Sequence, residues 1–429
     1  MNSHLKNLSY MLVVQIANYL LPLINIPILA RAFGPENLGL ITYITAITAY
    51  FVLLVDYSFN FTGVRRISKE KLNPIKVFNV ILTARIFLLL ISIVLFSFSL
   101  YFIQNLRQNF LLLIIFFISC LVPVFTNMWF LQAHNNFKEI AIFNFITKLV
   151  VTVGIVFLIK SKDDILEYAL LLNFSNLVIA IFSFIYICIK YDIKFRIEKP
   201  IDVFIYLKED KFLFLSSIVT NLYTTTGIVI LGALTTKAEV GYYGSAQKII
   251  ELAKNIIAMP IYQVIFPVLA KKFGENELKG LEAVKKIIPI FNLIVLIMAT
   301  GLITLGYFII YILFGIEFLQ SYLILIILSF GLVAVFYGIL IGGQIMLNLG
   351  MDRYFVKIQV IVSIFSIFLS YIVLPYGGAI TIAIIWTISE IAITLYQIHF
   401  LRRRGIHVLS WTQLSFSSIL HSVKYVLGR

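Results

Sequence analysis

The sequence has few charges, few cysteines and no long polar segment, and each absence excludes a class of protein. Charged residues make up 13% of the 429 residues and hydrophobic residues 61%, whereas a typical soluble domain has about 25% charged residues. A soluble chain of this length could not cover so much apolar surface. Both cysteines lie inside apolar runs, so we expect no disulfide framework. The sequence contains no Walker A loop, nucleophile elbow or Cys/His metal spacing. We therefore expect that the protein is not an enzyme and that it binds no metal or cofactor.

The apolar residues that are present fall in blocks of about 20, the length that crosses a hydrocarbon core about 30 Å thick. We therefore expect an all-α integral membrane protein with about 12 transmembrane helices, and membrane lipid as its solvent. The predicted spans are residues 8–30, 38–60, 77–103, 110–131, 140–160, 165–189, 212–235, 241–270, 287–313, 320–347, 354–374 and 379–401.

Basic residues are concentrated on one side of the predicted membrane. Of the 34 lysines and arginines, 25 fall in segments on the same side as the N-terminus, and five fall in loops on the opposite side. By the positive-inside rule, this bias predicts that both termini are cytoplasmic. The net charge of +14 is then explained without a nucleic-acid partner.

The longest predicted cytoplasmic loop, residues 190–211, divides the chain into two halves of six spans. A short pattern at residues 28–39 recurs at residues 230–241, with a constant offset of 202. This echo predicts two pseudo-symmetric six-helix bundles that face each other across a central cavity. The expected divisions are an N-terminal bundle with its connecting loop (1–211), a C-terminal bundle (212–401) and a basic tail that forms an interfacial helix (402–429).

Charged residues inside spans are candidate functional residues, because each costs about 2.5–3.5 kcal/mol on insertion scales. The basic ones predict a cationic cavity for an anionic substrate, with phosphate as the obvious group. They are Arg85, Lys148, Lys248 and Lys254 within the spans, together with Arg31 at the outer mouth of the first span. Lys248, Glu251 and Asn255 share one helix face, although a self-neutralised cluster is a second interpretation. Arg85 could contact the substrate. Alternatively, it snorkels to the interface or forms an ion pair with Asp56.

Polar side chains recur at helical spacing in the first span of each predicted half. Gln15, Asn18 and Asn25 form one stripe, and Asn221 and Thr224 belong to the other. These stripes are expected to line a shared aqueous cavity, with Asn255 from the following span. Hydrogen bonding between helices is the alternative interpretation.

Glu390 lies near the middle of the last predicted span, with no basic residue within four positions. A lone carboxyl at that depth suits proton binding and release, or else it is a permanently protonated structural group. We assign ion coupling to Glu390, Asp56 and Glu251 as a prediction.

Several segments resemble Wzx-type O-antigen and oligosaccharide flippases. The most specific are residues 13–23 and 30–39, and the segment Val55–Thr62 that precedes Arg65 and Arg66. Weaker similar segments follow in the same order, at residues 129–132, 226–232, 344–347 and 378–390. The resemblance implies the MATE-like fold of the multidrug/oligosaccharidyl-lipid/polysaccharide exporter superfamily, in the bacterial cytoplasmic (inner) membrane.

The resemblance also implies a substrate and a direction. Members of this family flip undecaprenyl-pyrophosphate-linked oligosaccharide to the periplasmic leaflet by alternating access, coupled to an ion gradient, and the polysaccharide polymerase and chain-length machinery are expected partners. A small-molecule or drug exporter of the same superfamily is the alternative, which the excess of cavity cations argues against. A membrane-embedded glycosyltransferase or polymerase would need a carboxylate constellation or a large outer loop, and the sequence contains neither.

Overall fold

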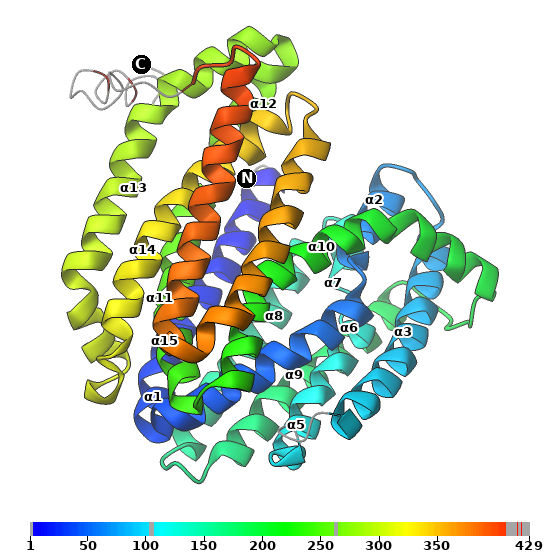
Figure 1. Cartoon of the computed structure of the whole chain (residues 1–429). Coiled ribbons are helices and arrows are strands. Elements are labelled where there is room, and N and C mark those ends of the chain that lie inside the picture. The colour runs from blue at the N-terminus through cyan, green and yellow to red at the C-terminus, as the bar shows by residue number, and fades with distance from the viewer. Residues whose placement is uncertain (1–2, 103–106, 261–264, 409–417, 419–421, 423–429) are drawn as a thin grey trace. The chain divides into compact units, whose positions relative to one another are not determined.

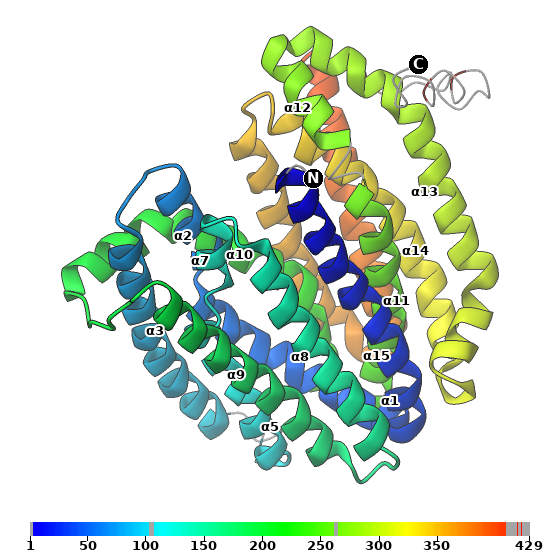
Figure 2. The same ribbon diagram turned by 180° about the vertical axis from the view of Figure 1, so that it is seen from behind.

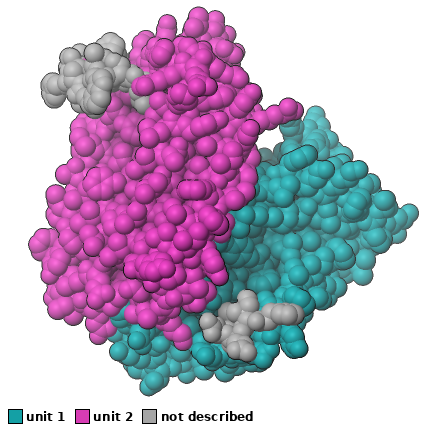
Figure 3. All heavy atoms as spheres, viewed as in Figure 1, with its two compact units in different colours: residues 1–229 teal, residues 230–429 magenta. Residues whose placement is uncertain are grey.

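The protein is described by a computed structural model that covers residues 3–102, 107–260, 265–408, 418 and 422. These residues form helices and connecting turns, with no β-strand among them, which confirms the predicted all-α class. The chain divides into two compact units, residues 1–229 and 230–429 (Figure 3).

Unit 1 is built from helices that begin with one long, broken helix (Figures 1 and 2). The elements are α1 (Ser3–Asp56), α2 (Phe59–Ser68), α3 (Pro74–Phe102), α5 (Phe110–Phe117), η1 (Ile118–Leu121), α6 (Val122–Phe125), α7 (Met128–Ala133), α8 (Phe137–Leu158), α9 (Ile165–Lys190) and most of α10 (Pro200–Leu234). The hydrophobic core that these helices form includes the buried rings of Phe78, Trp129 and Phe130.

Unit 2 contains the end of α10 and the helices that follow it. They are α11 (Lys237–Pro260), α12 (Phe266–Glu275), α13 (Glu277–Leu313), the 3-10 turn η3 (Ile316–Phe318), α14 (Ser321–Gly338), the π-helical η4 (Ile339–Met346) and α15 (Asp352–Arg403). An ideal Cβ at Gly331 of α14 would lie 2.5 Å from the ring of Trp386 in α15. Glycine therefore allows these two helices to approach closely.

Two glycines separate predicted spans that otherwise run on as one helix. In α1, Gly34 has φ 66° and ψ −177°, and in α15, Gly378 has φ 55° and ψ −139°. Residues with side chains rarely adopt these dihedrals. Each break falls in a gap between predicted spans, 30–38 in the first case and 374–379 in the second.

Eight helices of the described chain are long and apolar enough to cross a membrane, or nine if the two arms of α10 are counted as one broken span. Of the eight, Leu20–Ser68 contains the end of the first predicted span and all of the second, and Asp352–Arg403 contains the last two predicted spans. α11, which corresponds to the predicted span 241–270, is not among the eight. The figure of about 12 spans, the two-bundle layout and the cytoplasmic termini therefore remain predictions.

The connection between the predicted halves is shorter than expected. Only residues 191–199 are non-helical, because α10 already begins at Pro200, and proline is favoured in the first turn of a helix. The predicted division at 211/212 consequently lies inside α10, whereas the compact units divide at 229/230. Most of the predicted interfacial helix in the tail lies outside the described residues.

Candidate functional site

The break between α1 and α2 is the most unusual piece of backbone in unit 1. Tyr57 and Ser58 are consecutive non-glycine residues with positive φ, 47° and 62°, a conformation that costs about 1–3 kcal/mol per residue. Contacts to α10 support it. The Tyr57 hydroxyl donates to the Leu207 carbonyl at 3.0 Å, the Tyr57 ring stacks on Phe214 at 4.1 Å, and the Ser58 and Ser217 hydroxyls lie 2.8 Å apart.

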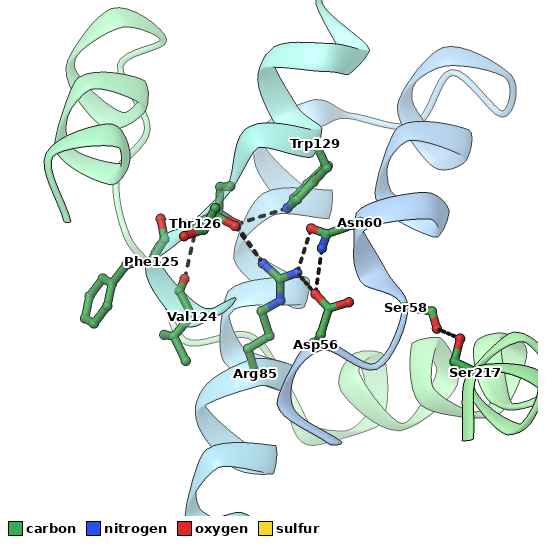
Figure 4. Close-up of polar contacts among 10 residues, drawn as sticks. Asp56, Ser58, Asn60, Arg85, Val124, Phe125, Thr126, Trp129 and Ser217 are labelled. Atoms are coloured by element: carbon green, nitrogen blue, oxygen red, sulfur yellow. Dashed lines mark hydrogen bonds and ion pairs between the residues drawn. The ribbon is translucent and has the colours of Figure 1, made fainter. Parts of the chain in front are cut away.

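Asp56, at the end of α1, forms an ion pair with Arg85 of α3, which is completely buried (Figure 4). The Arg85 guanidinium donates to Asp56 Oδ1 at 2.7 Å and to Asn60 Oδ1 at 3.0 Å. Its other terminal nitrogen donates to the Thr126 carbonyl at 3.2 Å and to Asn127 Oδ1 at 3.3 Å. The ion pair that the sequence left open for Arg85 is therefore present, and snorkelling is not required.

The predicted span 110–131 is interrupted where it meets this arginine. Thr126 is extended (φ −80°, ψ 98°) between α6 and α7, which turns its carbonyl toward Arg85. The Trp129 indole donates to Asn127 Oδ1 at 3.0 Å. An ideal Cβ at Gly63 would lie 2.5 Å from the Trp129 ring, so the glycine makes room for it. Sequence reasoning missed Asn127, because nothing in a single sequence pairs it with a residue 42 positions away.

In unit 2, α11 carries a charged cluster at residues 248–254. Val240, Tyr243 and Ile250 are buried, whereas the side chains of Lys248 and Glu251 are each 47% exposed. Lys248 Nζ lies 3.4 Å from Glu251 Oε2. This is a long, solvated contact of the kind that contributes about 0–1 kcal/mol.

Lys254 and Asn255 follow Glu251 by about one helical turn and are half-buried. Among the described residues, no acid forms an ion pair with Lys254. The self-neutralised interpretation of this cluster therefore accounts for one lysine at most, because Glu251 carries a single charge against two.

Glu390 lies in a polar seam between α14 and α15. Thr387 and Thr394, one turn before and after it, donate to the carbonyls of Ile327 and Ala334 at 2.9 and 2.8 Å. The Glu390 side chain is 8% exposed, and no described group hydrogen-bonds or ion-pairs with its carboxyl. Gln397, on the same stripe, has a buried Oε1 with no hydrogen-bond partner in the described chain.

The other predicted residues are placed individually. Arg31 is exposed near the Gly34 break, and Lys148 is half-buried on α8. Asn25 has a buried Oδ1 without a hydrogen-bond partner among the described residues. Asn221 donates to the Ser217 carbonyl of its own helix at 3.2 Å, and Thr224 is exposed.

Gln15 and Asn18 lie in the described backbone of α1, but their side chains are outside the described residues. The structure thus brings together two pairs of the predicted residues, Asp56 with Arg85 and Lys248 with Glu251. Across the described residues, no three His, Cys, Asp or Glu side chains form a group that could hold a metal ion.

Residues 4–273 match the model of the family described as "Polysaccharide biosynthesis protein". A protein of Escherichia coli K12 named "Putative O-antigen transporter" is 24% identical over 413 residues, covering 94% of this chain and 98% of its own. A Staphylococcus aureus protein, "Capsular polysaccharide biosynthesis protein CapF", is 25% identical over 412 residues, covering 93% and 99%.

Two solved structures show the same fold. The lipid II flippase MurJ in an inward closed conformation superposes with a TM-score of 0.73 at 18% identity, covering 98% of this chain and 92% of its own. An inward-facing multidrug resistance MATE transporter gives 0.67 at 16% identity, covering 93% and 98%. The resemblance identified in the sequence is thereby confirmed. This chain belongs to the polysaccharide biosynthesis protein family, and it is a multi-pass protein of the bacterial inner membrane.

Proposed function

We propose that this protein flips undecaprenyl-pyrophosphate-linked oligosaccharide from the cytoplasmic to the periplasmic leaflet. The names of the Escherichia coli relative and of the lipid II flippase support a transporter of lipid-linked sugar rather than an enzyme. Two six-helix bundles with both termini in the cytoplasm would alternate access to a central cavity, as in the inverted or repeated halves of other transporters.

The observation that carries this proposal is the surplus of cations in the charged cluster of α11. Lys248 and Lys254 each lie three residues from the single acid Glu251, and Lys248 is half exposed. A lysine ammonium is a compact point charge that binds phosphate oxygens. We assign the pyrophosphate to these two lysines, with Arg31 and Lys148 as further cations and Asn25, Asn221, Thr224 and Asn255 as partners for sugar hydroxyls. Gln15 and Asn18 belong to the same proposed set.

Arg85 is given a different role. Its guanidinium is engaged by Asp56, Asn60, Thr126 and Asn127 and is fully buried. We propose that the Asp56–Arg85 pair stabilises the α1/α2 break through which unit 1 changes conformation. Direct contact of Arg85 with substrate is no longer needed to explain its position.

Glu390 is the proposed coupling residue. Its carboxyl lies in the seam between α14 and α15 without a described partner, so binding a proton or cation there changes the charge between two closely packed helices. Glu251, beside Lys248, is the second candidate. Substituting Glu390→Gln should make transport independent of an imposed proton gradient, and an unaltered dependence would exclude this role.

A deletion strain complemented with variants tests the substrate assignment. Lys248→Ala/Lys254→Ala should trap lipid-linked repeat units in the inner leaflet and lower surface polysaccharide by about tenfold or more, because two charge-assisted contacts to phosphate are lost. The matched control is Lys271→Ala/Lys285→Ala, which removes two exposed lysines from α12 and α13. Normal surface polysaccharide in the test variant, or unchanged glycan with altered drug tolerance in the deletion strain, would contradict the proposal and favour the drug-exporter alternative.

A further inference from the structure

The first arm of α10 has two faces of different chemistry. Val203, Leu207 and Asp210 point into unit 1 and are buried or half-buried. The opposite face exposes large apolar side chains, which are Ile201, Phe204, Ile205, Phe212 and Leu215. These positions fall within one stripe of a 3.6-residue helix. α10 then bends by 51° between residues 219 and 224, so the two arms point in different directions.

Three acids of this arm form ion pairs with basic residues of α2 and α3. Arg66 of α2 is 1% exposed and donates to Asp210 Oδ2 at 2.6 Å and to Glu209 Oε2 at 2.9 Å. Its guanidinium also lies 3.9 Å above the Tyr206 ring. Asp202 lies 3.8 Å from Lys76 of α3. These contacts determine how α10 is rotated about its axis, because a buried arginine must keep its carboxylate partners.

The basic residues between positions 194 and 211 face outward. All are exposed, and no acid in the described chain forms an ion pair with any of them. They are Lys194, Arg196, Lys199, Lys208 and Lys211. Only two nearby acids, Asp192 and Glu198, also lack an ion pair with a described residue, so the outward charge is positive. Lys211 lies over the ring of the exposed Phe212, with Nζ 5.0 Å from the ring centre.

From these observations we infer that residues 194–215 form a docking surface for anionic phospholipid headgroups. A helix with exposed bulky apolar side chains and flanking lysines is suited to the boundary between headgroups and acyl chains. Each lysine or arginine close to an anionic leaflet adds attraction that neutral lipid does not provide. The pairs toward unit 1 make this possible. Arg66 binds Asp210 and Glu209, Arg65 lies 3.7 Å from Asp210, and Lys76 pairs with Asp202, so the charges of the stretch that have no ion pair in the described chain are mostly basic.

The surface has a structural consequence within unit 1. The same α10 arm holds the α1/α2 break through the contacts of Leu207, Phe214 and Ser217 with Tyr57 and Ser58. Anionic lipid that orders α10 therefore orders the backbone next to Asp56. This inference concerns lipid recognition and does not depend on which substrate is transported.

Hydrogen–deuterium exchange on the full-length protein in lipid nanodiscs tests the inference. In an equimolar mixture of phosphatidylglycerol and phosphatidylcholine, amides of residues 194–215 should exchange more slowly than in phosphatidylcholine alone. We expect their exchange rate to be about one third of the phosphatidylcholine value or lower. Lys199→Gln/Lys208→Gln/Lys211→Gln should lose that difference. The control Lys271→Gln/Lys285→Gln/Lys357→Gln removes three exposed lysines of unit 2 and should keep it.

A second measurement needs no variant. Adding salt to the wild-type protein in the anionic nanodiscs should raise exchange over residues 194–215 toward the phosphatidylcholine value, because exposed charges are screened. Exchange that is equal in the two lipid compositions, or protection that is insensitive to salt and to the triple substitution, would overturn the inference. Neither readout measures transport, so the result is independent of the flippase proposal.

Discussion

The Arg85 site and the charged cluster of α11 are two charged regions in predicted spans, and they differ in how completely the charge is matched. Arg85 is fully buried and has four oxygen partners. Lys248 and Lys254 share one acid, and Lys248 is half exposed. A buried charge must be paired inside the protein because desolvation is costly, whereas an accessible and under-matched charge remains available to a ligand. The comparison shows that a charged residue inside a span can be given a structural or a ligand-binding role only when its partners are known.

Breaking the buried pair should give the largest effect. Arg85→Ala leaves Asp56 without its cation, and we expect the free energy of unfolding to fall by about 3 kcal/mol, the lower end for a broken buried pair because the Asp56 side chain is 24% exposed. Denaturation of purified protein in detergent measures it. Asp56→Asn/Arg85→Met removes both charges and should recover more than half of the loss. A stable Arg85→Ala variant would show that the pair is not structural.

Crowding the ring of Trp129, which hydrogen-bonds to Asn127, should give an intermediate loss of stability. Gly63→Ala places a methyl group 2.5 Å from the Trp129 ring, and overpacking of this kind costs about 1–3 kcal/mol. Its control is Gly274→Ala, where a Cβ would meet nothing within 4 Å. Equal stabilities in the two variants would mean that Trp129 moves without disturbing the Arg85 site.

Removing one hydrogen bond tests the same region more finely. Trp129→Phe keeps the aromatic packing but removes the indole donor to Asn127, and we expect a loss of about 1 kcal/mol. Asn127 would then be less well oriented toward Arg85. The loss should grow in the Asp56→Asn/Arg85→Met background, because the Trp129 indole is there the remaining described donor to the buried Asn127 Oδ1. An unchanged loss would assign it to packing alone.

On α11, removing the acid should barely change stability. Glu251→Gln deletes a contact of 3.4 Å between half-exposed groups, and the free energy of unfolding should change by less than about 1 kcal/mol. Binding of an anionic lipid-linked substrate should strengthen or stay the same, because both lysines are then unmatched. Weaker binding measured by titration would indicate that Glu251 itself contacts the substrate.

The smallest effect is expected at an ion pair outside the spans. Hydrogen bonds from Lys272 and Lys279 to Glu275, at 3.3 Å each, lower the pKa of that carboxyl. A lowered folded-state pKa contributes stability that is present above the ordinary glutamate pKa and is lost as pH falls through the lowered value. Acid titration should therefore weaken the α12/α13 junction slightly, and Glu275→Gln should flatten that part of the pH profile. An unchanged profile would show that solvent screens the pair completely.

Much of the fold could be predicted because its signals are local. Apolar blocks of about 20 residues predict the spans, the short gaps between them hold Gly34 and Gly378, and Lys248, Glu251 and Asn255 share a face within about two helical turns. The interruption near Asn127 was missed because residues 110–131 form one apolar block. The helix that begins at Pro200 within the predicted connection 190–211 was missed because the partners of its charges are distant in sequence, on α2 and α3.

The sequence by itself determined that this chain lies in a membrane, which family it resembles and which few charges enter its spans. Only the tertiary structure decided which partners those charges have. Asp56 is 29 positions from Arg85, and Asp210 is 144 positions from Arg66. Desolvation forces each buried charge to find a partner, and the partner is chosen by helix packing rather than by proximity along the chain. The same packing leaves Lys254 without an acid partner among the described residues and turns the lysines of α10 outward.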